Sequence, residues 1–182
     1  MPFHNTSIEG LTVFEPKVWK DDRGYFYESY NLKTLSEGGI TATFVQDNEA
    51  KSTYGVLRGL HYQVAPYAQA KLVRVLEGEV LDVVVDIRPN SSTYGQSFSI
   101  KLSAENKKQL FVPRGLAHGY VVLSETAIFA YKVDNYYSKE SEGGIIYNDP
   151  QLNIDWGIDL NDAILSEKDK ILPVLGEHRS LQ

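Results

Sequence analysis

The chain is a succession of short segments rich in β-branched and aromatic residues, separated by turn-forming residues at intervals of about eight to twelve positions. This spacing predicts strands, which we expect at 11–14, 25–30, 43–46, 56–63, 71–76, 79–87, 97–102, 109–112, 119–123, 127–133 and 144–147. The clearest hairpin is predicted around Gly78, which supplies the backbone freedom of a tight turn. Helical patterns are confined to 32–37, 103–107 and 166–172. We therefore predict an all-β jelly roll, a double-stranded β-helix with short peripheral helices, because that architecture protects its sheet edges.

Composition narrows the class of protein. With 182 residues the chain is expected to form one domain over 1–182, long enough to bury a core. The absence of cysteine excludes disulfides, thiolate metal sites and a cysteine nucleophile. No apolar stretch approaches the roughly 18 to 20 residues of a membrane span, so we expect a soluble, cytoplasmic protein with no membrane partner. The net charge of −6 disfavours nucleic acid as a partner, and an anionic ligand would need a pocket that gathers the few Lys and Arg side chains.

Several expected strands carry polar side chains on their apolar faces. Tyr131 shares its face with Phe129, and Lys71 shares its face with Val73 and Val75. By the same alternation Phe26 shares a side with Glu28, and Gln46 shares a side with Asn48. Polar groups on apolar faces are costly unless they are paired or functional, so this pattern predicts a lined cavity.

The tetrapeptide Arg58-Gly59-Leu60-His61 places an imidazole beside a fixed positive charge near a strand end. This pairing suits a base that removes a proton from a substrate carrying phosphate. In a regular strand Arg58 and His61 would point to opposite faces, so we expect an irregularity at Gly59. A carboxylate such as Asp169 on one imidazole nitrogen would fix the tautomer and raise the basicity of the other nitrogen.

His118 lies in a Pro-x-Gly-x-x-His turn that begins at Pro113 and leads into a strand. The turn is similar to the second motif of cupin barrels, where the histidine often binds a metal. A metal site usually needs three or more ligands, whereas the segment 58–63 offers one histidine. We therefore expect no metal and interpret His118 as a donor to a ligand oxygen, with a structural role as the alternative.

Taken together, the motifs resemble those of the dTDP-4-dehydrorhamnose 3,5-epimerases, a family of cupin-fold enzymes of deoxysugar biosynthesis. The similarity runs over nearly the whole chain, through the segments 15–17, 22–28, 44–48, 56–63, 71–74, 112–119, 130–132, 135–137 and 165–169. It implies a cofactor-independent isomerase that epimerises C3 and C5 of dTDP-4-dehydro-6-deoxy-D-glucose, giving dTDP-4-dehydro-L-rhamnose.

The resemblance also implies a role for individual residues. His61 matches the general base, Asp169 the carboxylate that orients it, Tyr131 the acid on the opposite face of the sugar, and Lys71 the cation that stabilises the enolate oxygen. The substrate-binding residues would be Arg23 and Arg58 on the diphosphate, Tyr137 on the thymine, and Phe26, Glu28, Gln46, Asn48, His118, Glu142 and Lys168 around the rest of the site. The family implies a homodimer with an exchanged N-terminal strand, which lends Arg23, Phe26 and Glu28 to the partner's site.

These residue types suit the reaction. A 4-keto group makes the hydrogens on C3 and C5 abstractable, an imidazole can remove them, and a lysine can stabilise the enolate. Because the substrate itself delocalises the charge, no cofactor is needed. The open alternatives are a C3-only or C5-only epimerase, a 3,4-ketoisomerase, a metal-dependent cupin enzyme and a non-catalytic sugar- or nucleotide-binding jelly roll.

Overall fold

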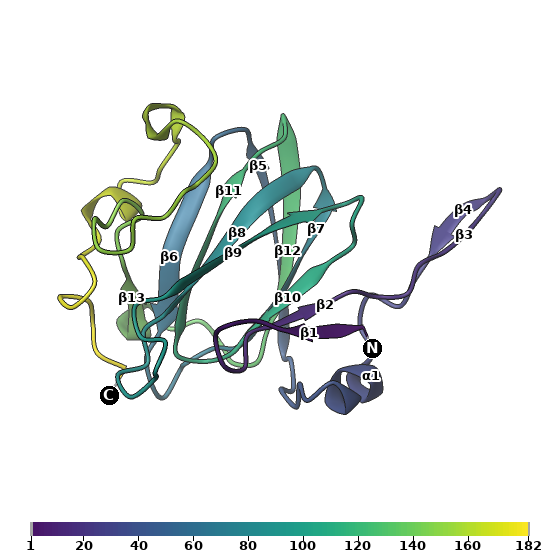
Figure 1. Ribbon diagram of the computed structural model, residues 1–182, viewed down its shortest axis with the longest axis horizontal. Coiled ribbons are helices and arrows are strands. Elements are labelled where there is room, and N and C mark those ends of the chain that lie inside the picture. The colour runs from purple at the N-terminus through teal and green to yellow at the C-terminus, as the bar shows by residue number, and fades with distance from the viewer. Residues whose placement is uncertain (1, 182) are drawn as a thin grey trace.

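Two antiparallel sheets form the body of the molecule in the computed structural model, which describes residues 2–181 (Figure 1). The six-stranded sheet has the order β1 (Phe3–Asn5), β2 (Thr12–Phe14), β10 (Gln109–Val112), β7 (Lys71–Glu77), β12 (Thr126–Val133) and β5 (Gln46–Thr53). The five-stranded sheet has the order β13 (Glu142–Gly144), β6 (Leu57–Gln63), β11 (Leu116–Val122), β8 (Glu79–Asp86) and β9 (Ser97–Ser103). The expected all-β jelly roll is confirmed.

A third, two-stranded sheet stands apart from the other two. It is a hairpin of β3 (Trp19–Asp21) and β4 (Gly24–Phe26), and it projects away from the body (Figure 1). Its aromatic side chains are largely exposed, with Tyr25 58% and Phe26 67% accessible. An exposed apolar patch of this kind is typical of an interaction site.

The space between the two large sheets holds the main core. Strand alternation places Val73 and Val75 of β7 opposite Val80 and Val84 of β8, and Phe129 of β12 completes the same cluster. Each of these side chains is almost fully buried, which contributes about 1.5 to 3 kcal/mol per large apolar residue. Tyr131 packs against the edge of this cluster, so its predicted inward orientation is confirmed.

The C-terminal segment covers the outer face of the five-stranded sheet. Its anchor is Trp156, which is buried and donates its indole N–H to the Tyr147 carbonyl at 2.8 Å. Buried Asp149 accepts backbone N–H bonds from Leu152 at 3.2 Å and from Leu175 at 2.5 Å, which ties two parts of the segment together. The segment includes the 3-10 turns η2 (Leu160–Asp162) and η3 (Asp169–Ile171), whereas η1 (Lys139–Ser141) precedes β13.

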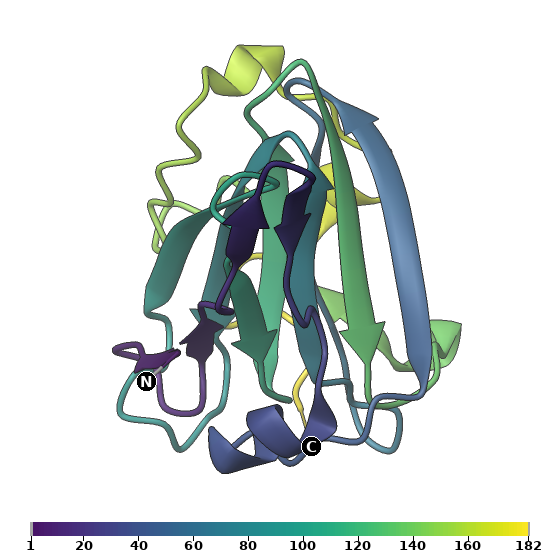
Figure 2. The ribbon, with the colours of Figure 1, turned by 90° about the vertical axis from the view of Figure 1, so that its right-hand side faces the viewer.

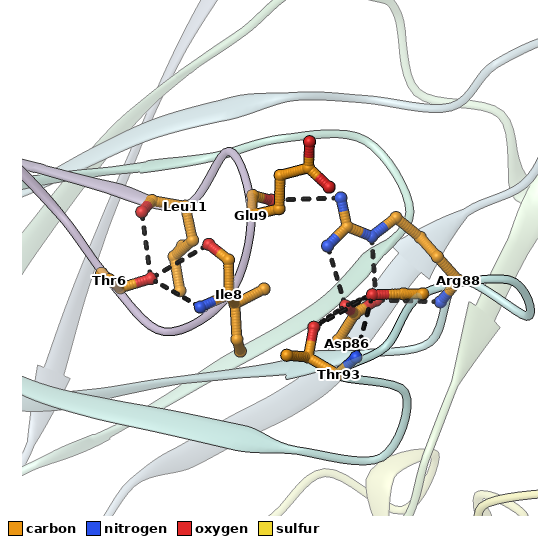
Figure 3. A network of polar contacts seen from close by, with 8 residues as sticks. Thr6, Ile8, Glu9, Leu11, Asp86, Arg88 and Thr93 are labelled. Atoms are coloured by element: carbon orange, nitrogen blue, oxygen red, sulfur yellow. Dashed lines mark hydrogen bonds and ion pairs between the residues drawn. The ribbon is translucent and has the colours of Figure 1, made fainter.

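The loop between β1 and β2 is fastened to the loop after β8 (Figure 3). Arg88 pairs with Asp86 at 2.7 Å and also donates to the Glu9 carbonyl at 3.1 Å. Ser91 and Thr93 each donate to Asp86 at 2.6 Å. Burial works to raise the pKa of Asp86, but these donors outweigh it and hold the pKa well below its usual range.

Helix α1 (Leu32–Glu37) lies at one end of the sheets (Figures 1 and 2). It begins at Asn31, whose side chain accepts the N–H groups of Lys33 and Thr34 at 3.0 and 3.3 Å, as an N-cap residue does. Leu35 is the residue that the helix buries, in a cluster with Phe14 and others. The prediction of a helix at 32–37 is confirmed. None of the helices within residues 2–181 is long and apolar enough to cross a membrane.

Five predictions of local structure are wrong. The strand expected at 25–30 ends at Phe26 of β4, so Glu28 lies outside it and shares no strand face with Phe26. The segment 103–107 ends a strand and forms a turn rather than a helix, and only 169–171 of the expected helix at 166–172 is helical, as one 3-10 turn. The strand expected at 43–46 begins at Gln46 and runs on to Thr53, because pairing with β12 extends a polar segment that lacks an apolar pattern. The segment 144–147 contributes Gly144 alone, to β13.

The hairpin predicted at Gly78 is also wrong, although the chain turns there. Strands β7 and β8 belong to different sheets: β7 pairs with β10 and β12, whereas β8 pairs with β11 and β9. Gly78 has a φ of +76°, and an added Cβ would lie 2.1 Å from the Thr126 carbonyl oxygen, so the crossing needs glycine. Both strands bury valines in the shared core, which the crossing makes possible.

Candidate active site

A bulge in β6 brings Arg58 and His61 to one cavity. On the neighbouring strand β11, His118 pairs with His61 but Tyr120 pairs with Arg58, so β6 carries one extra residue. Gly59 adopts a φ of +131°, and a Cβ there would lie 2.5 Å from the Gly119 Cα. The irregularity expected at Gly59 is therefore present, and two glycines allow the strands to approach.

The cavity lies between the two sheets and has a volume of about 130 Å³. Strands β5, β6, β7, β11 and β12 all contribute to it. Six polar or charged residues line it, together with Ala50, Gly119 and Phe129: Arg58, His61, Lys71, His118, Tyr120 and Tyr131.

His61 and Asp169 are in direct contact. The His61 Nε2 atom lies 2.6 Å from Asp169 Oδ1, and the carboxylate is buried while the imidazole is partly exposed. Burial works to raise the pKa of Asp169, but the hydrogen bond and charge of His61 outweigh it, so the pKa is lowered. An ionised carboxylate on Nε2 leaves Nδ1 as the nitrogen that can accept a proton, which is the arrangement of an oriented base.

Lys71 lines the cavity from the first position of β7. Its Nζ atom lies 3.5 Å from the His61 carbonyl oxygen. Burial lowers the pKa of Lys71 to about 8, against the opposing effect of Asp82 and Glu142. The ammonium group is therefore charged near neutral pH and lies close to the candidate base, as a group that stabilises a developing negative charge would.

The residue that sequence reasoning missed is Asp82. It is fully buried on β8, and its carboxylate oxygens lie 2.9 and 3.0 Å from His118 Nε2. Burial lowers the pKa of His118 and raises that of Asp82, in each case against the partner's influence. Strand alternation could have found it, since Asp82 shares its face with Val80 and Val84, just as Lys71 does with its valines. Asp82 holds the His118 ring and adds negative charge next to Lys71.

Tyr131 enters the cavity from β12. Burial raises its pKa, against the opposing charge of Arg58, so the phenol keeps its proton at neutral pH. Asn48 is the cross-strand partner of Tyr131 on β5, and Gln46 donates to Asn48 at 2.8 Å. The predicted sharing of one face by Gln46 and Asn48 is confirmed, and both lie at the Tyr131 side of the site.

A polar cluster lies beside the base. Glu142 of β13 pairs in register with Gln63 of β6, and it forms an ion pair with Lys168. Tyr137, which is 59% exposed, donates its hydroxyl to Glu142 at 3.3 Å. Tyr137 and Glu142 lie five positions apart, and Lys168 joins them from 26 positions further along, next to the strand that carries His61.

Eight of the predicted binding residues do not line the cavity of their own chain, and three of these lie on or just after the projecting hairpin. Arg23 is at the tip of the β3–β4 hairpin and pairs with Asp21 at 2.5 Å. Phe26 lies on the same hairpin, and Glu28 accepts a hydrogen bond from Asn31 at 3.2 Å near α1. Arg23, Phe26 and Glu28 line other hollows of the surface instead.

The donor set of the site does not match a metal centre. Within the described residues 2–181, no three His, Asp or Glu side chains are grouped so that they could hold a metal ion. His118 and His61 instead each pair with one carboxylate.

The sequence of the chain matches a known family. The family model described as dTDP-4-dehydrorhamnose 3,5-epimerase matches residues 5–177. The chain belongs to this family. Membership identifies the protein as an enzyme of the isomerase type, as the sequence predicted.

Individual relatives share most of their length with the chain. The dTDP-4-dehydrorhamnose 3,5-epimerase of Shigella flexneri is 54% identical over 165 residues, which is 90% of each chain. A crystal structure of dTDP-6-deoxy-D-glucose-3,5-epimerase from Legionella pneumophila, in complex with dTDP-4-keto-L-rhamnose, is 52% identical with a TM-score of 0.92, covering 96% of this chain and 93% of that one. ChmJ, a 3'-monoepimerase from Streptomyces bikiniensis in complex with dTDP-quinovose, is 32% identical with a TM-score of 0.89, covering 94% and 87%.

Proposed function

We propose that the protein epimerises C3 and C5 of dTDP-4-dehydro-6-deoxy-D-glucose to give dTDP-4-dehydro-L-rhamnose. The observation that supports this most is one cavity lined by His61, Lys71 and Tyr131, with Asp169 bonded to the histidine. The family and the relatives named as 3,5-epimerases point to the same reaction.

The first half of the reaction removes a proton next to the 4-keto group. The Nδ1 atom of His61 takes the proton from the carbon, and the electron pair of the C–H bond becomes the C–C double bond of an enolate. The negative charge on the C4 oxygen is stabilised by the ammonium group of Lys71. Asp169 stabilises the imidazolium that forms, because its carboxylate is already bonded to Nε2.

The second half returns a proton to the opposite face of the ring. Tyr131 donates its phenolic proton to the carbon, the enolate collapses to the ketone, and the configuration is inverted. The raised pKa of Tyr131 keeps this proton in place until the enolate forms. The substrate's own carbonyl takes up the charge throughout, so we propose no cofactor and no metal for this site.

Substrate binding would involve the groups around the cavity. Arg58 is exposed at the rim and is proposed to hold the diphosphate together with Arg23. Tyr137 would stack on the thymine. The rest of the nucleotide sugar would contact Phe26, Glu28, Gln46, Asn48, His118, Glu142 and Lys168.

We propose that the working form is a cytoplasmic homodimer with an exchanged N-terminal hairpin. Arg23 and Phe26 lie on a projecting hairpin with exposed aromatic side chains, away from their own cavity, which suits insertion into a second copy. The partner's cavity would then gain the residues that one chain lacks. The absence of cysteine fits a reducing compartment.

The test is incubation of the protein with dTDP-4-keto-6-deoxyglucose in deuterated water, followed by NMR. Deuterium at both C3 and C5, together with the L-rhamno product, is expected. A C3-only epimerase is the second candidate, because a 3'-monoepimerase is among the similar structures. Label at C3 with C5 unlabelled would favour that candidate, and a migrated carbonyl would indicate a ketoisomerase.

The same experiment tests the acid. Tyr131→Phe removes the phenolic proton and leaves the base, so the variant is expected to exchange the C3 hydrogen with solvent while the yield of inverted product falls. If Tyr131→Phe epimerises both centres at the wild-type rate, Tyr131 is not the acid.

A further inference from the structure

The hydroxyl group of Tyr120 is unusual for a buried polar group. Tyr120 lies on β11 and is 5% exposed. Among the buried side-chain nitrogen and oxygen atoms of residues 2–181, its hydroxyl oxygen alone forms no hydrogen bond. More than nine in ten buried polar groups are paired, because an unsatisfied one costs about 1 to 3 kcal/mol. An unpaired hydroxyl group that faces a cavity is therefore a candidate to form a hydrogen bond with a bound ligand.

The surroundings of this hydroxyl are those of the catalytic cavity. Tyr120 lines it together with His61, Lys71 and Tyr131. The ring is held firmly, because it stacks on Phe129 with centroids 4.0 Å apart and planes 15° from parallel. A fixed ring keeps the hydroxyl in one place, which is the preorganisation that a binding group needs.

The polar neighbours of Tyr120 are already engaged. Arg58 is the cross-strand partner of Tyr120. Burial raises the pKa of Tyr120, against the opposing effects of the Arg58 charge and the Ser52 hydroxyl. Ser52 accepts a hydrogen bond from Arg58 at 3.2 Å, and nearby Asp82 is bonded to His118. The phenol forms no hydrogen bond with these groups, so its O–H donor remains for a molecule that enters the cavity.

We propose that Tyr120 is a substrate-binding residue that donates a hydrogen bond to an oxygen of the sugar ring. The inference rests on the proposed function and deepens it. Arg58 is exposed at the rim, where a diphosphate would lie, whereas Tyr120 is buried among the groups that act on the ring. A sugar oxygen is thus the acceptor, and a site built to bond it discriminates against sugars that lack it.

The test is Tyr120→Phe, which removes one oxygen and keeps the stacked ring. Calorimetric titration with dTDP-glucose, which lacks the keto group and cannot react, should show affinity weakened by about 2- to 12-fold. Affinity for dTDP should be unchanged. The ligand-free variant should unfold at the same or a higher temperature, because an unsatisfied polar group has been removed.

Tyr62→Phe is the matched control. Tyr62 is equally buried, but its hydroxyl lies outside the cavity and donates to the Arg179 carbonyl at 2.5 Å. This variant should unfold at a lower temperature and bind both ligands as the wild type does.

Two results would overturn the proposal. If Tyr120→Phe lowers the unfolding temperature and leaves dTDP-glucose affinity intact, the hydroxyl is structural. If dTDP and dTDP-glucose lose affinity by the same factor, the contact is to the diphosphate rather than to the sugar. Failure of the proposed function would appear instead in the wild-type protein, as an absence of ketosugar turnover.

Discussion

His61 is the residue on which the proposed reaction depends most, because its ring joins the buried Asp169 to the cavity. His61→Ala removes the base and leaves the cations Arg58 and Lys71 in place. We expect turnover to fall by about two orders of magnitude or more, while affinity for dTDP stays near the wild-type value. Steady-state kinetics and calorimetry measure the two effects.

The matched control is His4→Ala, on the exposed edge strand β1, which should turn over substrate normally. Near-normal turnover of the His61→Ala variant would show that another group is the base.

The lowered pKa of Lys71 predicts that kcat/KM depends on pH. Its lowered pKa of about 8 means that it is charged below that pH and neutral above it. Because the charge stabilises the enolate, kcat/KM should fall as the pH rises, with an apparent pKa of about 8. A pH profile of the wild type measures this limb. Lys71→Arg keeps its charge at high pH, so its profile should lose the limb even if its rate is lower; an unchanged limb would assign the ionisation to another group.

Among the elements, the C-terminal segment contributes both to the stability of the fold and to the active site. Trp156 anchors it to the outer face of β6, β8 and β11, and the same segment carries Asp169 to His61. Trp156→Ala should lower the free energy of unfolding by about 3 to 5 kcal/mol, from lost burial and the cavity left behind. Urea denaturation measures the change.

Ile171→Ala is the control for this prediction, because Ile171 lies in the same segment but is 82% exposed. It should change the free energy of unfolding by less than about 0.5 kcal/mol. Equal losses in the two variants would mean that Trp156 does not anchor the segment.

The strands differ in how clearly their sequence patterns predict them. β12 reads TAIFAYKV, which is rich in apolar, β-branched and aromatic residues, and a strand was predicted at 127–133. β5 reads QDNEAKST, with exposed residues at alternate positions on a sheet edge, and its pairing with β12 determines its extent. An edge strand buries little, so its sequence carries little apolar signal.

For the whole molecule, the proposed exchange of hairpins makes each site composite. Co-expressed His61→Ala and Arg23→Ala chains should form mixed dimers in which one site has an intact cavity and an intact hairpin. The mixture should therefore recover activity that neither variant shows alone. Turnover of purified mixed dimers, separated by two affinity tags, measures the effect.

The control is a mixture of His61→Ala with Tyr131→Phe, whose defects lie in the same cavity, so every site of the mixed dimer is defective. If the first mixture is no more active than this control, the hairpin does not complete the partner's site. The expectation that residues 1–182 form a single domain stays a prediction.

The sequence by itself determined the features that depend on residues a few positions apart in the chain. The alternation of side chains put Lys71 and Tyr131 on inward faces, and Asn31 began the helix at 32–37, because period and capping involve residues a few positions apart. The motif around Gly59 indicated a bulge for the same reason.

Contacts between distant residues depended on the packed structure. His61 meets Asp169 across 108 positions, and His118 meets Asp82 across 36, because sheet register and the wrapping of the C-terminal segment bring them together. The unpaired hydroxyl of Tyr120 likewise exists only where the two sheets enclose a cavity. Alternation tells which way a side chain points, but what it meets there is decided by strands that lie far away in the chain.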